Sequence, residues 1–566
     1  MDTPTSVPRY LVRPETLDAY EEVTSDVLVI GGGVAGLSAA IAAASSCRVA
    51  VVTKEWLTDS NTAFAQGGVA AVLARTDSIE QHIADTLNVG QGICDESVVR
   101  HVVGEGPAAI RRLIEWGGQF DMKDGDFALS KEGGHSEGRV LHAGDATGLE
   151  IQRVLTEYAR SLRRIAIYEH TYVLDLLSAE GRCVGALARA KRGFVLFRAG
   201  AVILCTGGVG QVYRETTNPE VATGDGPAMA FRAGAVLRGM EFVQFHPTTL
   251  YFAGVARILI SETLRGEGGV LRDKFGNQFM KEYHPSAELA PRDVVSRAIM
   301  DTMAKTGDTN VYLDLTHLPS TYVRERFPRI NRACANYGID ITREMIPVHP
   351  TAHYMIGGVR VDEQARSNIP GLFAAGEAAC SGLHGGNRLG SNSLLEGLVL
   401  GSTAGRVASR ELPSRIPTAA YGGAPLEGSE GMELDATDMR NSLKSLTWRQ
   451  CGIQREGDSL RDALRKLDKW ARFIFKAPAT TVEHWELANM VTVALLITRS
   501  ALLREESRGV HYRRDFPDRD DVHWRGYIEL QLDENGEVQE RYFPLAAASE
   551  TEESSREPSS SGAHTR

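Results

Sequence analysis

A strand, a glycine-rich turn and a helix near the N-terminus limit most strongly what this chain can fold into. Residues 23–55 read VTSDVLVIGGGVAGLSAAIAAASSCRVAVVTKE. The apolar run DVLVI is typical of a parallel strand that is buried on both faces. Gly31, Gly33 and Gly36 follow it as GxGxxG, a turn in which the backbone and the next helix N-terminus can approach a pyrophosphate. The pattern predicts a Rossmann-like α/β dinucleotide-binding domain and leaves open whether the dinucleotide is NAD or FAD.

The acidic residue expected at the end of the second strand is displaced in this chain. The segment VVTKE places Lys54 and Glu55 there, so either Glu55 binds a ribose or Lys54 contacts the cofactor. Asp225 in TGD and Glu377 in GEAA each lie beside glycines further along the chain. An acid in such a place binds ribose or ribityl hydroxyls, or it only caps a helix.

The glycine turns also predict the domain organisation. Two more segments, AVILCTGGVG (201–210) and GLFAAGEAA (371–379), repeat a strand followed by glycine, which indicates one nucleotide-binding domain with an insertion. We predict that this domain spans 23–245 and 355–411, and that an α+β capping domain spans 246–354. A Pro/Gly/Ser-rich linker is expected at 412–433 and a C-terminal helical domain at 434–535. Residues 1–22 and 546–566 are predicted to be flexible and disordered, respectively.

Composition excludes several classes of protein. The net charge of −11 over 566 residues argues against nucleic acid as a bulk electrostatic partner. The seven cysteines are scattered singly without a CxxC pair, so no disulfide framework and no metal site is expected, and a reducing cytoplasm fits best. The N-terminus lacks a basic region followed by an apolar stretch, and the chain has no uninterrupted run of 18 apolar residues. We therefore expect neither secretion nor a membrane span.

Four short segments carry histidine or arginine beside glycines or at expected domain junctions. They are FHPT with His246, APRDVVSR with Arg292, TAHYMIGGV with His353, and GGNRLGSNSLLEG with Arg388. Protonated histidine and arginine donate hydrogen bonds, and the planar arginine fork suits a carboxylate. Together they could enclose a small dianion, although any one of them could instead be an ordinary surface or satisfied polar residue.

The ordered motifs resemble a known family. The segments GGGVAGLSAA, AFAQGG, KEGGHS, TGGVGQVY, TGDG, EFVQFHPT, SETLRGEGG, PRDVVSRAI, HYMIGGV, GLFAAGEAACSGLHGGNRLGSNSLLEGLVLG and ESRGVHY occur in this order. In this respect residues 24–535 are similar to the succinate dehydrogenase/fumarate reductase flavoproteins, and most similar to the members that oxidise L-aspartate. The resemblance implies FAD as the cofactor.

The resemblance also implies a set of FAD-binding residues. They are Gly31, Gly33, Val34, Ala35, Gly36, Lys54, Ser60, Asn61, Thr62, Ala65, Gln66, Gly67, Gly68, Asp225, Glu377, Ser391, Ser393 and Leu394. Asn61 stands where the membrane-complex succinate dehydrogenases carry a histidine that bonds to FAD. Without that nucleophile we expect FAD to be held noncovalently.

For the substrate, the resemblance assigns His246, His353 and Arg388 to the two carboxylates, with Ser261 and Glu262 adding hydrogen bonds. Arg292 matches the family's catalytic proton-transfer arginine. An arginine is an awkward base because its pKa lies above about 12, so Arg292 is expected chiefly to bind charge. Glu132 in KEGGHS lies where the dicarboxylate enzymes lack an acid. A carboxylate there complements the α-ammonium of aspartate, which would otherwise be buried unpaired.

The implied activity is FAD-dependent oxidation of L-aspartate to iminoaspartate, with reoxidation by oxygen or fumarate, as the first step of de novo NAD synthesis through quinolinate. Quinolinate synthase is the expected pathway partner, and a cytoplasmic monomer or small homo-oligomer is expected. One alternative is a soluble fumarate reductase or a succinate dehydrogenase flavoprotein subunit. Another is a catalytically silent flavin-binding protein, which the presence of His246, Arg292, His353 and Arg388 disfavours.

Overall fold

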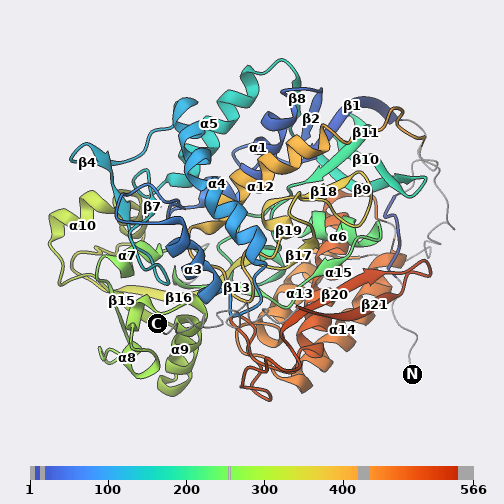
Figure 1. Ribbon diagram of the computed structural model, residues 1–566. Coiled ribbons are helices and arrows are strands. Elements are labelled where there is room, and N and C mark those ends of the chain that lie inside the picture. The colour runs from blue at the N-terminus through green and yellow to red at the C-terminus, as the bar shows by residue number, and fades with distance from the viewer. Residues whose placement is uncertain are drawn as a thin grey trace, which may run out of the picture.

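The computed structural model of the chain describes residues 7–12, 20–252, 254, 257–418, 434–477 and 479–545. Figure 1 shows three neighbouring parts: a central sheet with its helices, a green lobe at the lower left, and orange and red helices and strands at the lower right. The first part is built from both the beginning of the chain and residues near 400, as the interrupted glycine turns predict.

The central sheet has seven strands: β1 (Tyr20–Ile30), β2 (Val49–Val52), β8 (Ile165–Tyr168), β9 (Thr171–Ala179), β10 (Arg182–Ala190), β11 (Gly193–Leu204) and β18 (Leu372–Ala374). β8, β2, β1, β11 and β18 run parallel, whereas β10 pairs antiparallel with both β11 and β9. The first half of β11 pairs with β10 and its last three residues pair with β18. The carboxyl ends of the parallel strands therefore meet at one edge, and the three glycine turns follow there.

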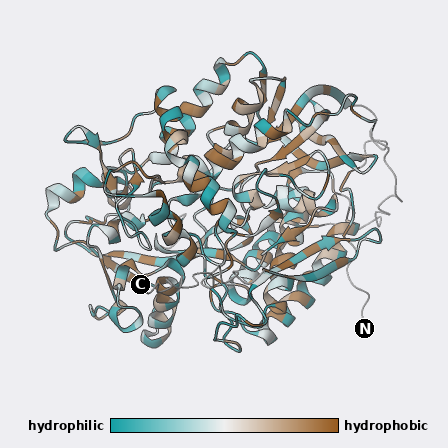
Figure 2. Cartoon of the chain, viewed as in Figure 1, coloured by the Kyte–Doolittle hydropathy of each residue, from teal (hydrophilic) through white to brown (hydrophobic). Residues whose placement is uncertain are grey.

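Helices made of small residues cover this sheet closely. α1 (Val34–Ala43) packs on α12 (Asn392–Ala408), and α3 (Ile79–Val89), α4 (Glu96–Glu115) and α5 (Thr147–Ser161) lie around them. A Cβ at Gly401 would lie 2.4 Å from the carbonyl oxygen of Ala35, and one at Gly405 would lie 2.0 Å from that of Ala39. Only glycine permits this approach, which explains the alanine- and glycine-rich sequences of both helices. Figure 2 shows brown, hydrophobic residues on the inner strands and helices and teal residues towards the outside.

The lobe at the lower left has its own sheet and core. Four antiparallel strands, β13 (Val243–Leu250), β16 (Ile346–Met355), β15 (Val311–Asp314) and β14 (Val270–Arg272), pack with α7 (Glu262–Gly266), α8 (Met280–Tyr283), α9 (Arg292–Thr306), α10 (Ser320–Arg326) and α11 (Pro328–Ala335). The chain enters through β13 and leaves through its partner β16, since Val243 pairs with Met355. An insertion joined through two adjacent strands agrees with an α+β cap between the two halves of the nucleotide-binding part.

The C-terminal part contains α13 (Ala436–Gln450), α14 (Gly457–Lys476) and α15 (Val482–Leu503), and then two strands. β20 (Gly526–Leu532) and β21 (Val538–Pro544) join β12 (Leu237–Arg238), β17 (Gly358–Arg360) and β19 (Ala379–Cys380) in a five-stranded sheet. The segment 434–535, predicted from helical periodicity, therefore ends in a strand. Its alternating GYIELQL sequence completes a sheet begun by the nucleotide-binding part.

Helix α15 is long and apolar enough, by composition, to cross a membrane, although the chain has no uninterrupted apolar run there. In its most apolar 18-residue window 78% of the residues are buried inside the molecule. The helix packs against α14, α13 and α6 (Asp225–Arg232). Its hydropathy therefore reflects a central core position.

Residues 7–12 and 20–22, the described part of the predicted flexible lead-in 1–22, are packed against the rest of the molecule or belong to a strand. Tyr20–Glu22 already belong to β1. Val7 is buried, and the backbone N–H groups of Leu11 and Val12 donate to Asp175 Oδ2 at 2.8 and 3.1 Å. The predicted linker 412–433 is described only up to residue 418, and the predicted tail 546–566 lies outside the described residues.

Small sheets position the loop that carries Glu132. β3 (Val69–Ala70), β7 (Val140–Leu141) and β6 (Leu129–Ser130) form one, and β4 (Met122–Lys123) pairs with β5 (Asp126–Phe127). The N–H of Ala70 donates to the carbonyl oxygen of Ser391 at 3.0 Å. This contact brings the loop after β6 next to the segment that precedes α12.

Candidate functional site

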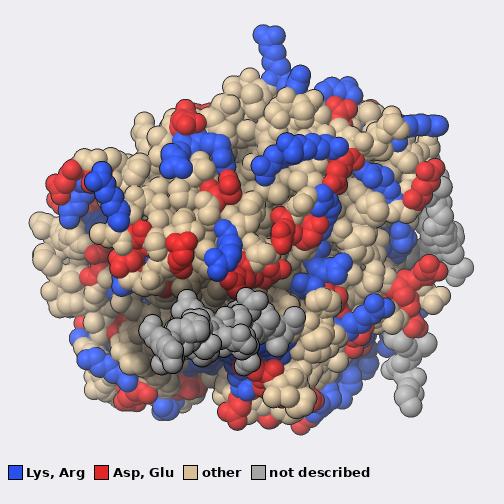
Figure 3. Space-filling model, in the orientation of Figure 1, with Lys and Arg blue, Asp and Glu red and all other residues tan. Residues whose placement is uncertain are grey.

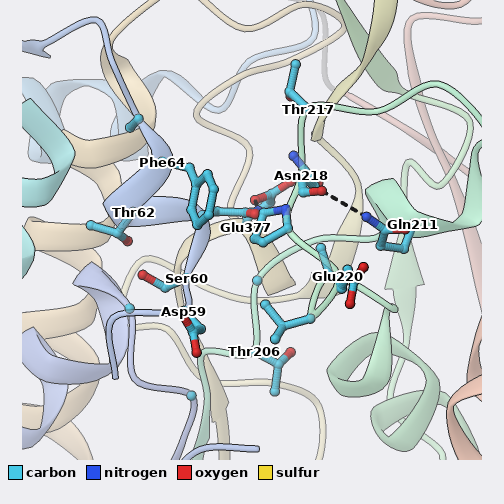
Figure 4. A pocket seen from close by; sticks show the side chains of 18 of the residues that line it. Asp59, Ser60, Thr62, Phe64, Thr206, Gln211, Thr217, Asn218, Glu220 and Glu377 are labelled. Carbon is cyan, nitrogen blue, oxygen red and sulfur yellow. Dashed lines mark hydrogen bonds between the residues drawn. The ribbon is translucent and has the colours of Figure 1, made fainter. Parts of the chain in front are cut away.

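A cavity of about 980 Å³ opens where the carboxyl ends of the parallel strands meet. Figure 4 shows part of it: Asp59, Ser60, Thr62 and Phe64 lie on one side, Gln211, Asn218 and Glu220 on the other, and Glu377 between them. Arg257, Ile258, Leu259 and Arg329 of the cap also line it. The cavity therefore joins the nucleotide-binding part to the cap.

The predicted glycine turn shapes one end of the cavity. Gly31 has φ 115°, and a Cβ there would lie 2.0 Å from the carbonyl oxygen of Cys205. Gly31, Gly33, Val34 and Ala35 all line the cavity at the N-terminus of α1. Gly36 does not line it, because it packs against the turn itself, where a Cβ would lie 2.0 Å from the carbonyl oxygen of Gly31. The third glycine thus serves close packing, as the GxGxxG pattern predicts.

The small-residue stretch at 58–73 lies along the same cavity. Ser60 caps the short helix α2 (Asn61–Phe64) by accepting from the N–H of Ala63 at 3.3 Å. Ser60, Asn61, Thr62, Ala65 and Gln66 line the cavity. Asn61 Oδ1 and Gln66 Oε1 are buried and accept no hydrogen bond from any described residue. Buried acceptors of this kind normally have a partner, so they suit a ligand that donates N–H or O–H groups.

Lys54 and Asp225 line the cavity but are saturated by protein contacts. The Lys54 ammonium contacts Thr223 Oγ1, Asp225 Oδ2 and Glu486 Oε1 at 2.7, 2.8 and 2.7 Å. Burial alone would lower the pKa of Lys54, but the two carboxylates raise it above its usual value. Because an ammonium has three donors, Lys54 holds Asp225 and α15 in place here. The alternative residue Glu55 lies away from the cavity, with its carboxylate 3.3 Å from His170 Nδ1.

Glu377 lies in a single 3-10 turn, η4 (Gly376–Ala378), and points into the cavity. Its Oε2 accepts from Asn61 Nδ2 at 2.8 Å, and its Oε1 accepts from the N–H of Met355 at 3.0 Å. Burial raises the pKa of Glu377 to about 7, partly offset by these two hydrogen bonds. Asn61 and Glu377, 316 positions apart in the chain, thus meet at the centre of the cavity.

The remaining predicted cofactor residues divide between the cavity and a neighbouring cluster. Ser393 and Leu394, in the first turn of α12, line the cavity. Ser391 donates to Glu132 Oε2 at 2.8 Å, and a Cβ at Gly67 would lie 3.1 Å from Glu132 Oε1. Gly68 packs against β7, where a Cβ would meet Val140 at 2.4 Å. Ser391 and Gly67 therefore lie beside the predicted substrate residues.

The predicted substrate residues come together from six separate segments of the chain. Arg292, at the N-terminus of α9, donates from Nε to Glu262 Oε2 at 2.6 Å. A Cβ at Gly390 would lie 2.8 Å from Glu132 Oε2, 3.2 Å from Arg292 Nη2 and 3.6 Å from Glu262 Oε2. The ends of these three side chains thus surround one glycine, which leaves space between them. Ser261, the N-cap of α7, lies at the same place, with its Oγ 4.0 Å from a Cβ at Gly67.

His246 on β13 and His353 on β16 lie across adjacent strands, with ring centroids 5.1 Å apart. His246 Nδ1 contacts the backbone of Thr248, and His353 Nδ1 contacts Thr217 Oγ1 at 2.8 Å. Burial and nearby arginines hold the pKa of both imidazoles well below the usual value. Both rings are therefore neutral near pH 7. The positive charge of the cluster comes from arginines, whereas the sequence alone also allowed protonated histidines.

The two carboxylates of the cluster have opposite pKa shifts. Burial, together with the Glu262 carboxylate, raises the pKa of Glu132. Burial alone would also raise the pKa of Glu262, but Arg292 and Arg265 bring it below its usual value. Burial and repulsion from Arg292 lower the pKa of Arg388 to about 10. Arg265, Arg292 and Arg388 outnumber the two carboxyl groups, and the raised pKa of Glu132 weakens its charge further, which leaves a site that favours anions.

Sequence reasoning missed several residues of this site. Gln244 contacts both Arg292 and Arg388, Arg265 is fully buried beside Glu262, and Glu486 pairs with Lys54. Tyr354 presents its ring to Arg388, with the guanidinium carbon 4.3 Å from the ring centroid. Gln244, Arg265 and Tyr354 lie within the family motifs, and Glu486 is an acid in the second turn of α15. Those signals were available in the sequence.

Comparisons with known proteins agree with this geometry. The profile described as "FAD binding domain" matches residues 26–394, and the profile "Fumarate reductase flavoprotein C-term" matches residues 440–557. The chain is 44% identical to the L-aspartate oxidase of Streptomyces coelicolor, over 90% of this chain and 92% of that protein. It is also 44% identical to the chloroplastic L-aspartate oxidase of Arabidopsis thaliana, over 87% and 81% of the two chains.

Solved structures show the same fold. A mutant of E. coli quinol fumarate reductase FrdA superposes with a TM-score of 0.84 at 33% identity, covering 94% of this chain and 98% of that chain. Mycobacterium smegmatis Sdh1 superposes with a TM-score of 0.80 at 34% identity, covering 93% and 94%. FAD is the cofactor, and the glycine turn, the helix N-terminus and the free acceptors Asn61 Oδ1 and Gln66 Oε1 fit it. The chain therefore belongs to the succinate dehydrogenase/fumarate reductase flavoprotein family and, within it, to the L-aspartate oxidases.

Proposed function

We propose that the protein oxidises L-aspartate to iminoaspartate with FAD and is reoxidised by oxygen or fumarate. The observation that carries this proposal is Glu132, a buried carboxyl group of raised pKa in a cluster that otherwise favours anions. A dicarboxylate without an amino group offers this carboxyl nothing to pair with. An α-ammonium offers it a charged partner.

The residues that would hold FAD are those that line the cavity. The N-terminus of α1 faces the cavity as an anion site for a pyrophosphate. Asn61, Gln66 and Glu377 supply acceptors deeper in the same cavity. Asn61 carries no nucleophilic nitrogen, so we propose noncovalent binding. When bound, FAD supplies the hydride acceptor of the reaction.

The arginines and histidines have separate tasks in this proposal. Arg388, with Nη2 free of any described acceptor, binds one substrate carboxylate. His246 and His353, both neutral, donate single hydrogen bonds to the carboxylates. Arg292 is fixed by Glu262 and binds charge beside the reacting carbon. Ser261 lies next to Gly67, and Glu262 lies next to Gly390.

Glu132 orients the amino group and holds it by charge. The oxidation removes a hydride from Cα and one proton from nitrogen, and leaves a carbon–nitrogen double bond. Because an ammonium next to Glu132 favours the ionised carboxyl, substrate binding reverses the pKa shift that burial imposes. A substrate that lacks the amino group leaves the pKa of Glu132 raised.

The decisive experiment is an anaerobic titration of the purified flavoprotein. We expect L-aspartate to bleach the visible absorbance of the flavin, and acid to release the flavin because it is not bonded. Bleaching by succinate but not by L-aspartate would overturn the proposal in favour of a soluble fumarate reductase or a succinate dehydrogenase subunit. That alternative is favoured only by the fumarate reductase and Sdh1 structures that share the fold.

The product suggests the place of this reaction in the cell. Iminoaspartate is unstable, so we propose that quinolinate synthase consumes it in the first steps of de novo NAD synthesis. We further propose a cytoplasmic location and a monomer or small homo-oligomer. Sedimentation of the purified protein, alone and with quinolinate synthase, tests the oligomeric state and the interaction.

A further inference from the structure

Gln244 connects the two arginines of the cluster through one side-chain amide. It lies in β13 and is fully buried. Its Oε1 accepts from Arg292 Nη1 at 3.2 Å and from Arg388 Nε at 3.0 Å. Its Nε2 donates to Asn387 Oδ1 and to the carbonyl oxygen of Arg388, both at 2.9 Å. Since arginines only donate, the amide can adopt only this orientation.

Asn387 continues the chain of hydrogen bonds to a carboxylate. Its Nδ2 donates to Asp293 Oδ1 at 2.8 Å, while its Oδ1 accepts from Gln244. Asp293 Oδ2 accepts from Arg297 Nη2 at 2.9 Å, and Arg297 Nη1 donates to the carbonyl oxygen of Gly509 at 3.0 Å. The polarity of this relay, from Gln244 through Asn387 to Asp293, is therefore set at one end by two cations and at the other by an anion.

The relay crosses the junction between two parts of the molecule. Arg292 and Asp293 are consecutive at the start of α9 in the cap. Asn387 and Arg388 are consecutive in the segment that leads to α12. The relay thus joins both arginine side chains and also the two backbone segments that carry them. A change in the cap position would break it.

We propose that Gln244 and Asn387 are positioning residues that set the spacing between Arg292 and Arg388, and hence the affinity for a four-carbon dicarboxylate. The identity of the ligand rests on the proposed function, whereas the relay itself does not. If these buried amides served only the fold, replacing them would lower stability but leave the succinate affinity of the folded protein unchanged. If they position the arginines, the affinity of the folded protein falls as well.

The test exchanges donor and acceptor between two residues. Asn387→Asp places a second carboxylate against Asp293, so it should weaken succinate binding by about tenfold or more. In the double variant N387D/D293N, the new amide donates to residue 387 and accepts from Arg297. Binding should then return to within about threefold of the unchanged protein. Succinate affinity is measured by titration calorimetry on the FAD-loaded full chain.

The kinetic readout separates positioning from folding. In Asn387→Asp the KM for L-aspartate should rise more than kcat falls, with FAD content unchanged. Asn310→Asp makes the same chemical change in the cap, where the side-chain amide donates one hydrogen bond, to the carbonyl oxygen of Val311 at 3.1 Å. It should bind succinate as the unchanged protein does.

Unaltered succinate affinity in Asn387→Asp, or no recovery in the double variant, would overturn the inference. If Asn387→Asp does not fold, Asn387→Ala removes both contacts without adding charge, and the same loss of affinity is required of it. The succinate affinities of the variants could follow the predicted order while the protein does not oxidise L-aspartate. That outcome would refute the proposed function but not the inference about the relay.

Discussion

Glu132 shows how surroundings give an ordinary residue a specific chemistry. Its carboxyl is buried, accepts from Ser391 Oγ at 2.8 Å, and lies beside Glu262, which together with burial raises its pKa. Glu262, only a short distance away, is held ionised by Arg292 and Arg265. The two carboxyl groups of one cluster thus have opposite pKa shifts, because burial and the Glu262 carboxylate prevail at Glu132, whereas the arginines prevail at Glu262. The cluster can therefore distinguish an amino acid from a plain dicarboxylate.

Replacing Glu132 tests this distinction at the level of one residue. Glu132→Gln keeps the size of the side chain but removes the charge that pairs with the ammonium. We expect kcat/KM for L-aspartate to fall roughly 30- to 150-fold, as for the loss of one partner of a buried ion pair, about 2–3 kcal/mol. Fumarate reduction, which involves no ammonium, should keep most of its rate. Equal loss of both activities would mean that Glu132 is structural.

The raised pKa of Glu132 also predicts a pH dependence. Aspartate binding needs the ionised carboxyl, so kcat/KM for L-aspartate should rise as pH increases through the pKa of Glu132, above its usual value. Succinate binding is favoured by the protonated carboxyl, so its affinity should fall over the same interval. Calorimetry and steady-state kinetics across acidic to mildly alkaline pH measure both. In Glu132→Gln the two opposing trends should disappear, and their persistence would assign them to another group.

At the scale of elements, glycine and alanine decide how closely α1 and α12 approach. α1 must start at the cavity edge, and α12 must begin shortly after Arg388, so the two helices share one small region. Glycines at 401 and 405 allow contact with the α1 backbone. Side chains there would move α1 and, with it, the helix N-terminus that faces the cofactor.

A matched pair of glycine substitutions tests this packing. Gly405→Ala places a Cβ 2.0 Å from the carbonyl oxygen of Ala39, so it should destabilise the fold by about 1–3 kcal/mol. Gly104→Ala, in α4, meets nothing within 4 Å and should stabilise by about 0.5–1 kcal/mol because alanine is the better helix former. Thermal unfolding of the two variants, with FAD bound, measures the difference. A stabilising Gly405→Ala would contradict the close approach.

At the scale of the whole molecule, the cofactor cavity depends on all three parts of the chain. The nucleotide-binding part supplies the glycine turn, the cap supplies Arg257 and Arg329, and α15 supplies Glu486 behind Lys54. Positive and negative side chains are intermingled on the face seen in Figure 3. The Lys54–Glu486 pair, in contrast, is largely buried, where solvent screens it less than at the surface.

The pairing of Glu486 predicts how the C-terminal helices contribute to stability. Glu486 contacts Lys54 Nζ at 2.7 Å and Arg440 Nη2 at 2.9 Å. Glu486→Gln should lower the free energy of unfolding by about 1–3 kcal/mol, because two cations lose a charged partner. Glu483→Gln, an exposed change on the same helix, is the control and should have little effect. Thermal unfolding that shows no difference between the two would mean that Lys54 is held by Asp225 alone.

Much of the fold was predictable because its signals are local. A glycine turn after an apolar strand, a second and third turn of the same kind, and helical periodicity near the C-terminus each depend on neighbouring residues. The strand at 526–532 was missed although its signal is local, since its alternating sequence pairs with β21 across a short turn. Burial of Val7 and the hydrogen bonds of Leu11 and Val12, in contrast, depend on partners far along the chain.

The sequence by itself determined the nucleotide-binding class, the insertion, and the residue types needed for a dicarboxylate, since motif spacing is written along the chain. Only the tertiary structure decided that His246 and His353 are neutral, that Lys54 is saturated by Asp225 and Glu486, and that Gln244 joins the two arginines. The physical reason is that pKa values and hydrogen-bond partners depend on burial and on distances through space, and residues hundreds of positions apart set both.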